Sequence, residues 1–178
     1  AGCFGKNSGQ QSRASGARSR LQILTDFRGF VRTAGARPGE TVLTSPEIPP
    51  PLSWRNLVVS WNVELPVDGY LVVEARGVFP DRATKFYNLG LWSEDPARHP
   101  RASVRSHKDA DSDFQTAILI LQQPGAKHHL RMTLVRSAAR IKLVCLSFLN
   151  PEAAPQGAPA PRASRGNSVA LPYRAHVH

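Results

Sequence analysis

The middle of the chain is a series of short apolar or alternating segments, each bounded by Gly, Pro, Asp or Asn. This pattern predicts β-strands, since no window keeps a helical apolar period over several turns. In the third segment Leu57, Val59 and Trp61 alternate with largely polar positions, as a half-buried strand requires. The predicted strands are 21–32, 40–48, 55–64, 69–78, 83–92, 114–122, 128–136 and 141–149.

Two turn motifs connect strands of this series. Pro66–Gly69 predicts a hairpin between the third and fourth strands, because proline presets the backbone and glycine takes the unusual dihedral. Gln123–Ala126 is a second turn, between the sixth and seventh. The last strand is apolar on nearly both faces, which is typical of an interior strand. The fold class predicted is all-β: an antiparallel two-sheet β-sandwich, jelly-roll-like, with disordered tails.

A length of 178 residues fits one domain with tails. We assign residues 1–20 to a flexible basic tether, 21–150 to the β-sandwich, and 151–168 to a linker rich in Pro and Ala. Residues 169–178 are interpreted as the start of a further domain. The longest apolar runs are far too short for a membrane-spanning helix.

Residues 93–113 interrupt the strand pattern with charges of both signs and are predicted to be a long loop. Asp109, Asp111 and Asp113 stand at every second position, as oxygen ligands do in calcium loops. No glycine turn or closing glutamate completes that motif, so a solvated acidic loop is the favoured interpretation and no metal is predicted.

The net charge of +10 lies mainly on the tails: residues 1–20 carry +4 and residues 151–178 carry +2. The segment between them has 16 basic and 12 acidic residues, leaving +4. Basic residues are not interleaved with aromatic ones as in base-stacking proteins. Nucleic acid is therefore not an expected partner.

The two cysteines predict neither a disulfide framework nor a zinc site. Cys3, in Ala1-Gly2-Cys3, matches the end of a bacterial lipoprotein signal, where the cysteine receives a lipid; an accidental tripeptide in a linker is the alternative. Cys145 stands among Leu143, Val144 and Leu146 and is predicted to be a core residue.

No arrangement of residues predicts catalysis. His128 and His129 are adjacent on a strand and so point to opposite faces, which prevents joint binding of one metal. Glycine-rich phosphate loops, paired metal motifs and nucleophile elbows are missing from the sequence. We therefore predict no catalytic residue, no metal and no cofactor for this chain.

The aromatic side chains allow two interpretations. Trp54, Tyr87 and Trp92 could stack on sugars and make the domain a freestanding carbohydrate-binding module. Trp61 and Trp92 could instead fill the core of the sandwich, which we favour.

Several motifs occur together in a characteristic order. They resemble the N-terminal β-domain of exported bacterial bacteriocin-processing-like cysteine peptidases, of the double-glycine, papain-like type. The resemblance covers about residues 24–150. The motifs are Thr44–Ile48, Ser60–Asn62 followed by Pro66 and Gly69, Glu74–Arg76, Phe86–Ser93, and Leu171–Arg174, which is similar to the strand that opens the peptidase domain.

The resemblance implies a non-catalytic accessory domain that binds substrate or envelope, or positions a peptidase domain in cis. The catalytic cysteine of the family follows the opening strand, and we expect this chain to end before it, so the longer protein rather than this chain would be the papain-like cysteine peptidase. A peptide or glycan ligand, a monomer, and export to the bacterial envelope or outside are further expectations. Membrane contact is expected only through a lipid on Cys3.

Overall fold

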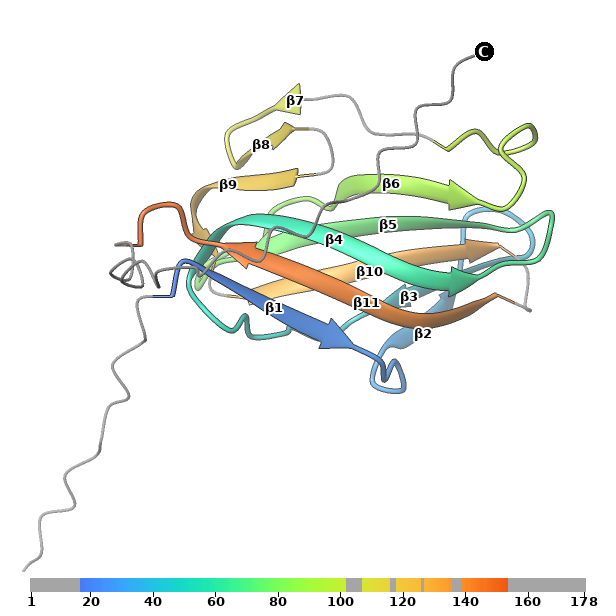
Figure 1. The fold of residues 1–178 in the computed structure, drawn as a ribbon, viewed down its shortest axis with the longest axis horizontal. Coiled ribbons are helices and arrows are strands. Elements are labelled where there is room, and N and C mark those ends of the chain that lie inside the picture. The colour runs from blue at the N-terminus through green and yellow to red at the C-terminus, as the bar shows by residue number, and fades with distance from the viewer. Residues whose placement is uncertain (1–16, 102–106, 116–117, 126, 136–138, 154–178) are drawn as a thin grey trace, which may run out of the picture.

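The structure is a computed structural model that describes residues 17–101, 107–115, 118–125, 127–135 and 139–153. These residues form two antiparallel sheets packed face to face (Figure 1). The strand order is β1-β11-β4-β9-β8-β7 in the six-stranded sheet and β2-β3-β10-β5-β6 in the five-stranded sheet. The strands are β1 (Ser19–Leu24), β2 (Val31–Ala34), β3 (Glu40–Thr44), β4 (Trp54–Glu64), β5 (Tyr70–Val78), β6 (Tyr87–Ser93), β7 (His107–Lys108), β8 (Ser112–Gln115), β9 (Ile118–Gly125), β10 (Lys127–Val135) and β11 (Arg140–Leu149).

The predicted all-β, two-sheet sandwich is confirmed. The described segments contain strands and turns only, and the sheets do not close into a barrel. Within these segments no helix has the length and apolarity to cross a membrane. Most of the predicted tether, the linker beyond Ala153 and residues 169–178 lie outside the described residues.

The predicted hairpin across Pro66–Gly69 is wrong. The turn itself forms, with the Gly69 N–H donating to the Pro66 carbonyl at 2.8 Å. It joins β4 of one sheet to β5 of the other, so the two strands face each other across the core. The turn before β10 likewise joins strands of different sheets. Alternation fixes the face that a strand buries, but it does not distinguish a hairpin from a crossing between layers.

Three other predicted segments are divided. The strand predicted over 114–122 is two strands, β8 and β9, which pair with each other. The single strand predicted over 21–32 is two strands, β1 and β2, which lie in different sheets. A bend between them is closed by the Phe30 N–H, which donates to the Phe27 carbonyl at 3.1 Å. The long predicted loop contains the small hairpin of β7 and β8, which extends the six-stranded sheet beyond β9.

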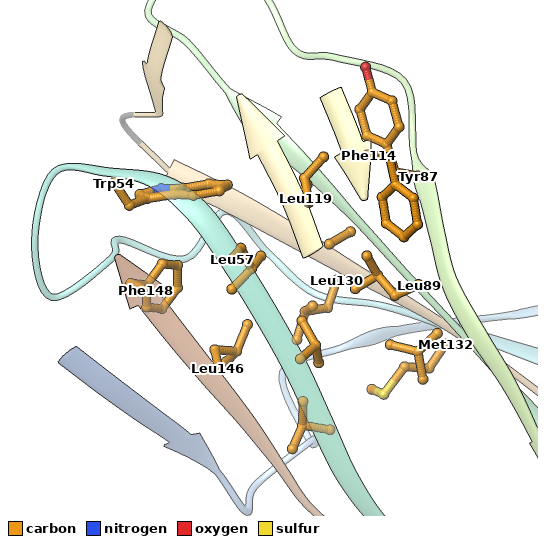
Figure 2. Close-up of a cluster of buried hydrophobic side chains, with 14 of the residues drawn as sticks. Trp54, Leu57, Tyr87, Leu89, Phe114, Leu119, Leu130, Met132, Leu146 and Phe148 are labelled. Carbon is orange, nitrogen blue, oxygen red and sulfur yellow. The ribbon is translucent and has the colours of Figure 1, made fainter. Parts of the chain in front are cut away.

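The core lies between the sheets and draws side chains from both (Figure 2). Trp54 and Phe148 meet edge to face, with ring centroids 5.5 Å apart. Each fully buried side chain of this size stabilises the fold by roughly 1.5–3 kcal/mol relative to exposure. The largest fully buried side chains are Trp54, Tyr87, Phe114, Phe148, Leu57, Leu71, Leu119, Leu121, Leu130, Met132, Leu146 and His128.

Strand β11 is interior, between β1 and β4, as predicted. Its buried residues Val144 and Leu146 point toward the second sheet. Cys145 lies between them and therefore points to the outer face, where it is half-buried. The prediction that Cys145 is a core residue is wrong, because an apolar run on a strand does not tell which of its two faces is covered by another layer.

Candidate functional site

The structure keeps Cys145 and His128 apart. Cys145 lies on the outer face of the six-stranded sheet, whereas His128 is completely buried between the sheets. Nor does the described part of the chain contain a group of three or more His, Cys, Asp or Glu side chains that could hold a metal ion.

The three aromatic residues predicted to bind sugars occupy different environments. Trp54 is 0% exposed and Tyr87 is 1% exposed, so both rings are enclosed in the core. Trp92 is half-buried on β6, the edge strand of the five-stranded sheet. Cys3, the predicted site of lipid attachment, lies outside the described residues.

Trp92 lines a cleft between the two sheets, which we call the tryptophan cleft. Its lining residues are Val59, Ser60 and Trp61 of β4 and Trp92 of β6, and its volume is about 260 Å³. The guanidinium of Arg101 stacks on Trp92, 3.7 Å from the ring centroid. Its Nε donates to the Ser93 carbonyl at 3.1 Å, which holds the Arg101 side chain over the ring. The sequence alone did not indicate Arg101, because it meets Trp92 across a turn.

A second hollow lies at the end of the sandwich where β4 starts and β9 ends. We call it the proline groove, and its volume is about 480 Å³. Proline surfaces dominate it, and proline is already restricted in the unfolded chain, so a partner that binds there orders little additional backbone. The lining residues are Pro49, Pro50, Pro51, Leu52, Ser53, Pro80, Pro124 and Gly125.

The described chain ends beside this groove. Arg55 donates from Nε to the Leu121 carbonyl at 3.1 Å and from one terminal nitrogen to the Gln122 carbonyl at 3.0 Å. Its other terminal nitrogen is paired with the Glu152 carboxylate.

Arg18 holds the same end of the chain from another side. The Asn150 N–H donates to the Arg18 carbonyl at 2.9 Å, and an Arg18 guanidinium nitrogen donates to the Pro151 carbonyl at 3.3 Å. Residues 150–152 are thus fixed to the sandwich from two sides.

The first two aspartates of the predicted acidic loop are paired with cations of the domain. Lys85 lies 2.7 Å from Asp109, and Arg82 lies 2.6 Å from Asp111. Partial burial by itself raises the pKa of Asp109. Hydrogen bonds from Lys85, from the backbone N–H groups of Ser112 and Asp111 and from the Tyr87 hydroxyl outweigh burial and hold that pKa well below its ordinary value. These contacts fasten the β7–β8 turn to the start of β6.

His128 is an unusual core residue. Neither ring nitrogen has a hydrogen-bond partner among the described residues, and the same holds for the Nε1 of its neighbour Trp54. Burial, with a smaller contribution from the charge of His129, lowers the pKa of His128 to about 4. His128 is therefore neutral near pH 7 and behaves as an aromatic core residue against Trp54 and Phe148.

Residues of two of the motifs meet on the outer face of the five-stranded sheet. Phe86 lies between two guanidinium groups, with Arg131 at 4.1 Å and Arg76 at 4.6 Å from its ring centroid. Arg131 also forms a two-pronged ion pair with Glu74, at 2.6 and 2.7 Å. The pairing of β5 with both β10 and β6 brings these residues, which are far apart in the sequence, together.

Comparison with known proteins gives one family. The model of the peptidase C39 N-terminal domain matches residues 4–148, which include every described strand except the end of β11. No curated protein and no solved structure matches the chain. The predicted resemblance to an accessory domain of such peptidases is confirmed: the chain belongs to the family of peptidase C39 N-terminal domains.

Proposed function

We propose that this β-sandwich is a non-catalytic domain that positions the peptidase domain implied by its family. The support for this function is the fixed position of residues 150–152, which we call the exit of the domain. Arg55 ties Glu152 to the end of the sandwich that bears the proline groove. A domain that only tethers its neighbour has no need of a rigid exit. A domain that orients its neighbour requires one.

The contacts of Arg55 make the exit stiff. One guanidinium group holds two backbone carbonyls of β9 and the Glu152 carboxylate at the same time. The planar, delocalised guanidinium suits such a multiple role, which a lysine could not fill. Arg18 restrains the other side of the same segment. The Pro- and Ala-rich composition after Ala153 favours a semi-rigid spacer, which would preserve the direction set at the exit.

The proline groove supplies a surface for the neighbouring domain at the same end. It is largely apolar and preformed, as docking surfaces between domains commonly are. Its position beside Glu152 supports contact with the segment that follows, because that segment starts there.

Small-angle scattering on the protein that contains both domains tests this function. With wild-type protein we expect a narrow distribution of interdomain distances. Arg55→Gln should broaden it, because the exit loses its ion pair and its multiple contacts. Lys142→Gln is the matched control, since it removes the Lys142–Glu64 ion pair at the opposite end of β4. A wild-type distribution as broad as that of two independently tethered domains would contradict the proposal.

Carbohydrate binding is the alternative function. It depends on exposed flat rings, yet Trp54 and Tyr87 are enclosed in the core and Arg101 covers one face of Trp92. One remaining ring face gives this alternative less support than the fixed exit gives to positioning.

Export and attachment to the bacterial envelope form a further part of the proposal. They are supported by the Ala1-Gly2-Cys3 sequence alone. Mass spectrometry of the protein recovered from its native membrane tests them, because a diacylglycerol-modified Cys3 is expected and an unmodified thiol would contradict the attachment.

A further inference from the structure

Strand β4 has an unpaired edge along its second half. Its pairing with β9 runs from Trp54 to Val58, while the strand continues to Glu64. Figure 1 shows β9 alongside only the first part of β4. On its other side β4 pairs with β11 up to Glu64. Among the described strands, no other one pairs with β4 from Val59 onward.

This edge offers backbone hydrogen bonds. In an antiparallel sheet the N–H and C=O groups of successive residues point alternately to the two neighbouring strands. Every second residue from Val59 to Glu64 therefore directs its backbone groups away from β11. Natural sheet edges are usually protected by charges, proline or bulges. The segment Val59–Val63 has no proline and no charged side chain.

The tryptophan cleft lies beside the same edge. Val59, Ser60 and Trp61 contribute to both, and Trp92 forms the opposite wall. Arg101, which stacks on the Trp92 wall of the cleft, is exposed and uses its Nε for the Ser93 carbonyl. The terminal guanidinium nitrogens of Arg101 could donate to a carbonyl or carboxylate of a ligand.

We propose that an extended peptide binds here by adding a strand to β4, with an apolar side chain between Trp61 and Trp92 and an acidic group near Arg101. An edge of unpaired N–H and C=O groups is complementary to another polypeptide backbone, and an adjoining apolar pocket selects alternate side chains. The positive charge of Arg101 favours an acidic peptide over a basic one. This binding site is separate from the proline groove, so either can fail while the other stands.

An NMR titration of the 178-residue chain tests the proposal. The probe is an acetylated, amidated heptapeptide in which threonine and valine alternate and one end residue is glutamate. The indole N–H signals of Trp61 and Trp92 should shift, while that of the buried Trp54 stays unchanged as an internal control. When about nine-tenths of the protein is bound, exchange of alternate β4 amides between Val59 and Glu64 should slow about tenfold.

Matched peptides and variants sharpen the result. The same peptide N-methylated at alternate nitrogens should not bind, and a lysine in place of its glutamate should weaken binding. Trp92→Leu should weaken binding about tenfold, whereas Leu21→Ser, on the outer face of β1, should have no effect; amide spectra confirm that both variants are folded. Equal binding of the N-methylated peptide, or no shift of the two indoles at millimolar peptide, would overturn the proposal. Indole shifts caused by a cello-oligosaccharide and not by the peptide would also overturn it, in favour of a glycan site.

Discussion

The Tyr87 hydroxyl lies 3.1 Å from both carboxylate oxygens of Asp109 and thereby joins the two sheets. Tyr87 belongs to β6 of the five-stranded sheet, and Asp109 lies in the β7–β8 turn of the six-stranded sheet. Burial, aided by the hydrogen bond to Asp109, raises the pKa of Tyr87 to about 12. The hydroxyl is therefore protonated near neutral pH and donates to the carboxylate.

Tyr87→Phe should lower the free energy of unfolding by about 1.5–3 kcal/mol, because a hydrogen bond to a charged acceptor is lost. The measurement is urea unfolding followed by circular dichroism. Arg28→Gln is the control, since the Arg28–Asp26 pair is on the surface with an arginine side chain 91% exposed, and no measurable change in stability is expected. Equal free energies of unfolding for Tyr87→Phe and wild type would show that the Tyr87–Asp109 hydrogen bond does not stabilise the domain.

His128 should make the domain less stable in mild acid. Its folded pKa of about 4 lies below the ordinary value of 6.5, so the unfolded chain binds the proton more readily. The contribution of neutral His128 to the free energy of unfolding is therefore complete above the pKa of the unfolded chain. It declines as the pH falls toward the pKa of the folded state. Between pH 7 and pH 5 we expect a loss of about 2 kcal/mol, in a range where carboxylates titrate little.

His128→Leu supplies the test of this pH effect. The variant removes the titrating ring and keeps an apolar side chain against Trp54 and Phe148. Its unfolding free energy should change much less between pH 7 and pH 5 than that of the wild type, whatever its absolute stability. The same pH slope in both proteins would assign the effect to other groups.

Gly125→Ala should destabilise the domain by about 1–3 kcal/mol through overpacking. A Cβ at Gly125 would lie 2.8 Å from Cε2 of the Trp54 ring, which is fully buried and cannot move away. Gly29→Ala is the matched control, because no heavy atom lies within 4 Å of the Cβ position there. Melting temperatures of the two variants measure the difference, and similar values for both would contradict the close approach of β9 to Trp54.

Arg131→Lys should cost about 1 kcal/mol although it keeps the charge. Lysine cannot form the two-pronged pair with Glu74 or stack flat on Phe86, which Arg131 does at 4.1 Å. Chemical unfolding measures the change. Lys127→Arg, in the exposed pair with Glu47, is expected to be neutral and serves as the comparison.

The sequence predicted the layers of this fold better than their connections. Alternation identified the buried face of β4, including Leu57 and Val59, because burial of a strand face leaves a period of two in the sequence. It could not identify β11 and β9 as the neighbours of β4, since those contacts depend on residues far along the chain. The mistaken hairpin at Pro66–Gly69 has the same origin.

The candidate sites were less predictable than the core. The sequence left Trp54 open to ligand binding, but Gly125, which is far from it along the chain, packs against its ring. Arg55 binds mainly backbone carbonyls, which leave no signature in the sequence. The run Pro49-Pro50-Pro51 is evident in the sequence, but nothing in it indicates that these residues line a groove.

The pairing of the first strand with the last has a consequence for synthesis. Among the strands that the structure describes, β1 pairs only with β11, and β11 also borders β4. Neither contact can form before the ribosome has released residues 140–149, so the six-stranded sheet cannot be completed until almost the whole domain has emerged. Such a late-folding chain stays available to chaperones and to any machinery that handles unfolded polypeptides.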